Sequence, residues 1–266
     1  MGEWVPGVDI SVYQGRVEPP TWRSLRALGE RVAVVGSWHG LSANPHAGHN
    51  LGAARAAGLR IATYVALNGS VAGREAVERG LRACGSTRRD LAFVALDCEI
   101  DGITPGTVAD AERAVREAGL RPAVYTARWW WRDRFGDPHD FAHLPLWNAA
   151  YDGDPDIDFA RVPYGGWAAA DVIGEQYTGT TSLAGLDVDR NSFRRSFVLG
   201  EEGRGRMLWL VREDGDPNAY TFVTDGIVRS YVSDASRLQQ LQEAGVWPRE
   251  VTVVPRGALA AIRRID

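Results

Sequence analysis

The sequence predicts an α/β protein: an irregular TIM-like β/α barrel of eight strands, followed by a small C-terminal α+β module. The first observation is a series of β-rich runs that recur about every 25 to 30 residues, the spacing of βα units. The second is that amphipathic segments fill the early gaps, whereas Asp, Pro and Gly fill the later ones. We therefore expect helices mainly in the first half of the barrel.

Eight runs are expected to form the barrel strands because they combine apolar, β-branched and aromatic residues. In chain order they are residues 8–11, 32–37, 61–67, 91–97, 122–127, 145–150, 172–178 and 186–189. Helices are expected at residues 21–30, 50–58 and 107–119. Thr107 is expected to cap the last of these, and Gly119 lies where glycine ends helices.

The chain is expected to divide into a barrel over residues 1–198, a polar glycine-containing linker over 199–206 and a module over 207–266. Strands in the module are expected at 207–213, 219–226 and 227–233, with Asp225-Gly226 as a hairpin turn and a short helix at 236–245. About sixty residues are marginal for an independent fold.

Composition excludes several classes of protein. A net charge of -4 argues against a nucleic-acid-binding surface, and no apolar run reaches the roughly 20 residues of a membrane span. Cys84 and Cys98 are too few for a disulfide framework or a metal-ligand cluster. Residues 1–6 show no signal peptide, so we expect release by a phage holin or delivery on a particle rather than classical secretion.

Two carboxylates end the fourth predicted strand. Asp97 and Glu99 are two residues apart, so on a strand they share one face, whereas Cys98 faces the helices. The carboxyl ends of barrel strands are where barrel enzymes hold their catalytic groups. Because neighbouring carboxylates repel, one pKa is expected to rise, which keeps that group a proton donor.

The first and last strands add further acids. Asp9 ends the first strand, and Asp187, Asp189 and Asn191 share one face of the last. In a closed barrel these strands are neighbours, so their acids are expected to converge with Asp97. A ring of carboxylates without a His or Cys cluster favours glycoside hydrolysis over metal chemistry.

The sequence resembles the family 25 glycoside hydrolases, or Chalaropsis-type lysozymes, a family that includes phage endolysin-like muramidases. The resemblance covers about three quarters of the chain, from Gly7 to Phe193. It is carried, in family order, by GVDISVYQG (from Gly7), LDCE (Leu96), RPAVYT (Arg121), PLWNAAY (Pro145), EQYTG (Glu175) and VDRN (Val188). It implies an irregular barrel that hydrolyses the β-1,4 bond between N-acetylmuramic acid and N-acetylglucosamine.

The resemblance also implies roles for single residues. Glu99 matches the general acid and Asp97 its partner, while Asp9 and Asp189 match the acids of two further motifs. It implies no metal and no cofactor. The chain departs from the family pattern at GSWHG (from Gly36), where a lysine-containing segment is common, and at YVA (from Tyr64), where Y-H-F is common.

Polar and aromatic residues are expected to line a carbohydrate groove, because rings stack on the apolar faces of sugars. The expected substrate-binding residues are Tyr64, Tyr125, Trp147, Tyr151, Gln176 and Tyr177. The run Trp129–Trp131 follows the fifth strand, and since three consecutive residues cannot share a face, at least one should pack in the core. Trp22 is expected in the core as well.

The leading hypothesis is a muramidase that degrades bacterial peptidoglycan strands, as a phage lysin or on a larger particle. Its C-terminal module would bind the cell wall or a partner protein. The alternative is a catalytically silent, sugar-binding or structural barrel of a phage-tail-like assembly. A third hypothesis is a related hydrolase of another N-acetylated polymer.

Overall fold

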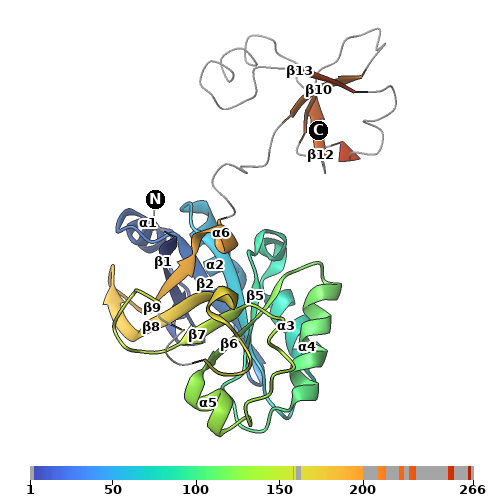
Figure 1. Cartoon of the computed structure of the whole chain (residues 1–266). Coiled ribbons are helices and arrows are strands. Elements are labelled where there is room, and N and C mark those ends of the chain that lie inside the picture. Colours follow the sequence, from blue (N-terminus) through green and yellow to red (C-terminus); the bar gives the residue numbers. More distant parts are fainter. Residues whose placement is uncertain are drawn as a thin grey trace. The chain divides into compact units, whose positions relative to one another are not determined.

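The computed structural model of the chain forms two compact units, residues 1–199 and 200–266 (Figure 1). In the first unit it describes residues 3–157, 159 and 163–199, and in the second it describes the backbone of five strands. No helix among these residues is long and apolar enough to cross a membrane.

Eight strands close into the predicted barrel, which confirms the fold class (Figure 1). In the order of the sheet they are β1 (Trp4–Ile10), β9 (Leu186–Arg194), β8 (Val172–Leu183), β7 (Leu146–Ala149), β6 (Pro122–Ala127), β5 (Val94–Asp97), β4 (Arg60–Ala66) and β2 (Val32–His39). Pairing between β1 and β2 completes the ring, and β3 (Ser42–Ala43) adds to the edge of β2. Within the ring, β9 is antiparallel to both of its neighbours.

The antiparallel hairpin β8–β9 is longer than the sequence indicates and closes the barrel against β1. Its turn residues Ala184 and Gly185 have positive φ angles of 54° and 74°. Two such residues form the two-residue turn that suits the twist of a hairpin. The hairpin therefore replaces the last βα unit of a regular barrel.

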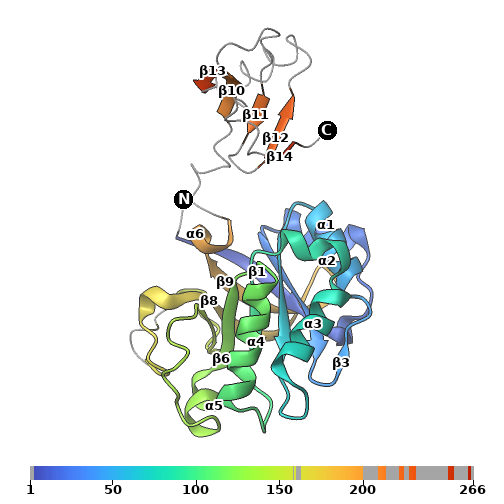
Figure 2. The same ribbon diagram turned by 90° about the vertical axis from the view of Figure 1, so that its right-hand side faces the viewer.

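Helices concentrate in the first half of the barrel, as expected (Figure 2). The longer helices are α1 (Pro19–Ala27), α2 (Ala47–Ala56), α3 (Gly73–Ala83) and α4 (Pro105–Glu117), and the shorter ones are α5 (Arg128–Asp133) and α6 (Arg195–Val198). Among the described residues of the first unit, 3-10 turns include η1 (Val12–Gln14), η2 (Gly85–Asp90) and η4 (Ala169–Asp171). The helices α2 and α3 pack on β2 and β4, and α4 packs on β5 and β6.

Three details of the helices differ from the expectation. Helix α3 was not expected because charged residues dominate its sequence, yet Ala76, Val77 and Leu81 form a buried stripe. The segment after the fifth predicted strand, where no helix was expected, forms α5 and contains the Trp run. Thr107 is not the N-cap of α4: Thr104 is, and the two side chains form a capping box.

Aromatic side chains fill the barrel interior. Phe93, Trp147 and Phe193 are fully buried, and their ring centroids lie 5.5–6.4 Å apart. Trp22 is also fully buried, as expected. Because the centre of the barrel is packed, a ligand can reach strand residues only at the ends of the barrel.

The second unit contains a five-stranded sheet. Its strands, in sheet order, are β13 (Val251–Val254), β10 (Trp209–Glu213), β11 (Phe222–Thr224), β12 (Val228–Tyr231) and β14 (Arg263–Arg264). The three expected strands appear as β10, β11 and β12, each antiparallel to the next. The expected turn at Asp225-Gly226, the helix at 236–245 and linker residues 200–206 lie outside the described residues.

We expect a chain truncated after Leu199 to fold, because the barrel core lies within residues 1–199. Its thermal unfolding should be cooperative, with a midpoint within about 3 °C of the barrel transition in the full chain. Differential scanning calorimetry of both chains measures this. An insoluble or noncooperative truncate would show that residues 200–266 are needed for the barrel to fold.

Candidate active site

Four carboxylates lie at the carboxyl ends of the parallel barrel strands. Asp9 is near the end of β1, Asp97 is the last residue of β5, and Glu99 follows it. The antiparallel strand β9 supplies Asp189, which lies directly opposite Asp9 in the β1–β9 ladder. Closure of the barrel therefore brings together acids that lie near the two ends of the sequence of the first unit.

Two amide side chains hold Asp9. Its Oδ2 accepts hydrogen bonds from Gln176 Nε2 at 2.8 Å and from Asn191 Nδ2 at 2.7 Å. Gln176 Nε2 also donates to Asp189 Oδ2 at 3.3 Å. The amide oxygens accept from Tyr125 Oη at 2.8 Å and from Trp147 Nε1 at 2.9 Å, which fixes both amides with their N–H groups toward the acids.

Burial makes the Asp9–Asp189 pair hard to ionise. Desolvation and the neighbouring charge of Asp189 raise the pKa of Asp9 to about 7, although the bonds from Asn191 and Gln176 oppose this shift. Burial also raises the pKa of Asp189. Each carboxyl group of the pair therefore holds its proton more tightly than an ordinary aspartate does.

Asp97 and Glu99 are held by backbone N–H groups. The sequence analysis placed both residues on one face of a strand. Strand β5 ends at Asp97, however, so Glu99 lies beyond the strand. Asp97 Oδ1 accepts from the Glu99 N–H at 3.1 Å, and Glu99 Oε1 accepts from the Ala127 N–H at 2.6 Å. The end of β6 thus fixes the Glu99 side chain.

The pKa values of both groups are raised, where the sequence predicted a rise for one. Burial, then the charge of Glu99, raises the pKa of Asp97 to about 8. Burial raises the pKa of Glu99 against the opposing hydrogen bond from Ala127. The site can therefore hold protons at neutral pH, which general acid catalysis requires.

Three tyrosines surround the carboxylates. The Tyr64 ring packs over Gly36, where a Cβ atom would lie 2.4 Å from Cζ. Burial and the charges of nearby acids raise the pKa of Tyr64 well above its usual value, which keeps the phenol neutral. Tyr125 is buried, and its Oη lies 3.2 Å from that of Tyr151, whose side chain is half exposed.

Two expected sugar-binding residues do not face the groove. Trp147 is 1% exposed and lies beneath the site, where its Nε1 supports Asn191. Tyr177 is buried with its ring 5.6 Å from the guanidinium of Arg190, away from the acids. Trp147 is thus part of the floor of the site, and Tyr177 stabilises the outside of β8.

In the Trp run, Trp130 and Trp131 are buried and Trp129 is 54% exposed, so two of the three pack in the core. Trp129 lines a pocket of about 410 Å³ that the sequence did not reveal. Glu175, Asn148 and Tyr164 line it too. Glu175 precedes Gln176 on β8, so strand alternation alone could have placed it on the outward face.

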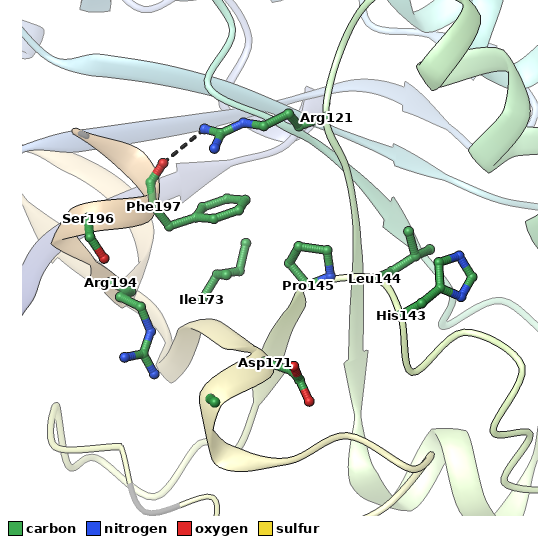
Figure 3. Close-up of a pocket in the computed structure, with 10 residues that line it drawn as sticks. Arg121, His143, Leu144, Pro145, Asp171, Ile173, Arg194, Ser196 and Phe197 are labelled. Atoms are coloured by element: carbon green, nitrogen blue, oxygen red, sulfur yellow. Dashed lines mark hydrogen bonds between the residues drawn. The ribbon is translucent and has the colours of Figure 1, made fainter. Parts of the chain in front are cut away.

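A second pocket, whose lining residues are drawn in Figure 3, lies at the end of the barrel opposite the acids. Arg121, Pro145 and Asp171 line it, and each precedes a strand whose carboxyl end faces the acids. Arg121 donates to the Phe197 carbonyl at 2.9 Å, the dashed line in Figure 3, so its charge already has a partner. This pocket is separate from the carboxylates.

Among the described residues, no group of three or more His, Cys, Asp or Glu side chains is arranged to hold a metal ion. The four acids are instead held by amide side chains and backbone N–H groups. Such a set can donate a proton and stabilise positive charge, the two tasks of glycoside hydrolysis.

A family model described as "Glycosyl hydrolases family 25" matches residues 8–186, about two thirds of the chain. The chain belongs to glycosyl hydrolase family 25. The match includes Asp9, Asp97 and Glu99 and ends before Asp189. The inclusion of Asp189 in the site of this family 25 chain therefore rests on the β1–β9 ladder.

Relatives of this family 25 chain agree with the assignment. A probable GH family 25 lysozyme 3 from Dictyostelium discoideum is 26% identical over 200 residues, 70% of this chain and 40% of that protein. The chain thus spans less than half the length of that relative.

Two solved structures share the fold. The bacterial lysozyme from Streptomyces coelicolor is 21% identical, with a TM-score of 0.61 over 73% of this chain and 96% of that one. The CTP1L endolysin is 17% identical, with a TM-score of 0.59 over 97% of this chain and 85% of that one.

We expect the raised pKa values to make the family 25 barrel less stable as pH rises. A carboxyl group whose pKa is about 8 when folded and 3.8 when unfolded stabilises the protein fully below about pH 4, and this stability is lost as pH rises through 8. Asp97→Asn, which cannot ionise, should therefore raise the melting temperature at about pH 8 by about 5 °C and flatten its pH dependence.

Thermal unfolding between about pH 4 and pH 8 measures this effect. Asp101→Asn is the matched control, because the Asp101 side chain is 75% exposed and should leave the slope unchanged. Parallel curves for the native chain and Asp97→Asn would contradict the buried, protonated state of Asp97.

Proposed function

We propose that the chain is a lysozyme that hydrolyses the β-1,4 bond between N-acetylmuramic acid and N-acetylglucosamine in peptidoglycan. The observation that carries this proposal is the pairing of Glu99 with Asp97 at the barrel mouth of a family 25 chain. Family membership supports the substrate, and the geometry supports the use of carboxylates.

Glu99 acts as the general acid. Its Oε1 is held by the Ala127 N–H, which leaves Oε2 as the oxygen that carries the proton to the glycosidic oxygen. Burial raises the pKa of Glu99, so a larger fraction is protonated at a given pH than for an exposed glutamate. Proton transfer lets the leaving sugar depart as an alcohol.

Asp97 stabilises the positive charge that develops on the sugar as the bond breaks. In this mechanism the carbonyl oxygen of the substrate N-acetyl group attacks the anomeric carbon as the glycosidic bond breaks, and Asp97 accepts a hydrogen bond from the amide N–H. Water then attacks the anomeric carbon, which reopens the ring that the N-acetyl group had formed and completes the hydrolysis. The hydrogen bond from Glu99 N fixes the Asp97 carboxyl group toward the mouth. Because ionised Asp97 is strongly disfavoured in the free site, substrate binding is expected to lower its pKa.

Asp9 and Asp189 position the sugar and set the electrostatic potential of the site. Their shared hydrogen bonds to Gln176 hold both carboxyl groups at the mouth. Tyr64 is a neutral phenol that can donate a hydrogen bond, and the half-exposed Tyr151 offers a ring for sugar stacking. Tyr125 donates its proton to Gln176, so its part is to hold that amide.

We further propose that the enzyme reaches the wall as a phage lysin or on a larger particle, and that residues 207–266 bind the wall or a partner protein. The similarity to the CTP1L endolysin extends over 97% of the chain, which supports the proposal that a module with a role in lysis follows the barrel. Wall pull-down of the module compared with the barrel tests its role.

We expect Glu99→Gln to lower the rate of hydrolysis by about 10² to 10⁴, because it removes the proton donor but keeps the bond from Ala127. Release of reducing ends from purified actinobacterial peptidoglycan measures the rate. Glu117→Gln, an exposed glutamate on α4 paired with Arg74, is the matched control and should keep native activity.

Full activity of Glu99→Gln would remove this residue from the mechanism. If the folded native chain releases no reducing ends, the barrel is a silent sugar-binding protein or acts on another polymer.

A further inference from the structure

The pocket lined by Trp129 and Glu175 adjoins the candidate active site through the end of β6. The residues Arg128 and Trp129 follow Ala127, whose N–H holds Glu99, and they line the pocket of about 410 Å³ described above. The other side of the pocket comes from the outward faces of β7 and β8 and from the loop after β7. The end of β6 therefore links this pocket to Glu99.

The base of this pocket is a buried carboxyl group held in one orientation. Glu175 is 3% exposed, and its Oε2 accepts from Asn148 Nδ2 at 2.7 Å. Asn148 Oδ1 accepts from Tyr164 Oη at 2.7 Å, so the amide cannot turn around. Glu175 Oε1 accepts no hydrogen bond from another described residue and is not among the described atoms that are buried without a partner, so it is open to a ligand in the pocket that Glu175 lines.

The charges around the pocket are mostly negative. Asp152, Asp154 and Asp156 line it together with Glu175, and Arg128 contributes one positive charge. Burial and the charges of Asp152 and Asp154 raise the pKa of Glu175 to about 7. A cation seated in the pocket would reverse this shift and give Oε1 a partner.

The lining favours an organic ammonium group over a metal ion. The described carboxylates of the chain do not converge into a set of three or more that could hold a metal. Aromatic rings of Trp129, Phe159 and Tyr164 line the same pocket. Rings beside a carboxylate bind a primary ammonium through charge-assisted hydrogen bonds and cation–π contacts.

We propose that this pocket, with Glu175 Oε1 at its base, binds a primary ammonium group carried by the peptidoglycan substrate. This proposal rests on the proposed function and adds a specificity site to it. The ammonium has two possible sources in the wall: the free amine of a diamino acid in the stem peptide, or a glucosamine that has lost its acetyl group.

The test compares KM for soluble peptidoglycan with free amines and for the same material after N-acetylation, slightly above the pKa of Glu175. The native chain should show a KM about tenfold lower for the amine-bearing polymer. The KM ratio is defined as the KM of the acetylated polymer divided by the KM of the amine-bearing polymer. In Glu175→Gln, which keeps the side-chain shape, this ratio should fall from about ten to about one. Glu78→Gln, an exposed glutamate on α3, should keep the native ratio.

A structural role for Glu175 would change activity on both polymers alike and leave their KM ratio at the native value, which would overturn the proposal. So would equal KM values in the native chain. If Glu175→Gln does not fold, Asp152→Asn replaces it and should lower the ratio about threefold, since Asp152 is exposed.

Two further substrates distinguish the two possible sources of the amine. They also distinguish failure of the ammonium site from failure of the proposed lysozyme activity. Peptide-free strands with de-N-acetylated glucosamine carry one amine, and peptide-bearing strands with fully acetylated sugars carry the other. The source of the ammonium is the one whose glycan strands have a lower KM before N-acetylation than after it. If neither polymer is hydrolysed, the proposed function fails. The ammonium site is then tested by calorimetry: a lower Kd for amine-bearing than for acetylated fragments supports it, and equal Kd values overturn it.

Discussion

The pairing of β1 with β9 is the constraint on which the site depends. It closes the barrel and places Asp9 opposite Asp189, an arrangement that costs free energy because like charges face each other across a ladder. Gln176 and Asn191 offset part of this cost by donating to Asp9. Without closure the two acids would be separate, solvated residues.

The packed interior converts this closure into a reactive mouth. Trp147 lies among the core aromatics, yet its indole N–H fixes Asn191 and through it Asp9. Tyr125 similarly fixes Gln176. Core residues thus set the orientation of site residues, and burial raises the pKa of the same acids that must carry protons.

Much of the fold and of the acid cluster could be predicted from the sequence. Strand periodicity and the position of acids at strand ends indicate a barrel with Asp9, Asp97, Glu99 and the acids of residues 187–189 at one mouth, and the family resemblance singles out Asp189. Helix α3 was not predicted, because its apolar stripe is narrow and most of its other residues are charged. The hairpin β8–β9 could not be seen at full length, because its polar residues resemble a loop.

Side-chain roles were less predictable because they depend on which neighbours the fold supplies. An aromatic residue near a strand end can lie on the groove, as Tyr151 does, or beneath it, as Trp147 does. Glu175 is informative only once Asn148 and Tyr164 are known to enclose it. Alternation gives the face of a strand, but not what covers that face.

The most direct test of the account is a carbon-13 NMR titration of the aspartate and glutamate carboxyl carbons in the folded chain. The structure predicts that Asp97 titrates at about 8 and Asp9 at about 7, with Asp9 and Asp189 showing coupled curves. If all four site acids titrate near about 4, as exposed carboxyl groups do, the mouth does not hold its protons and the account is wrong.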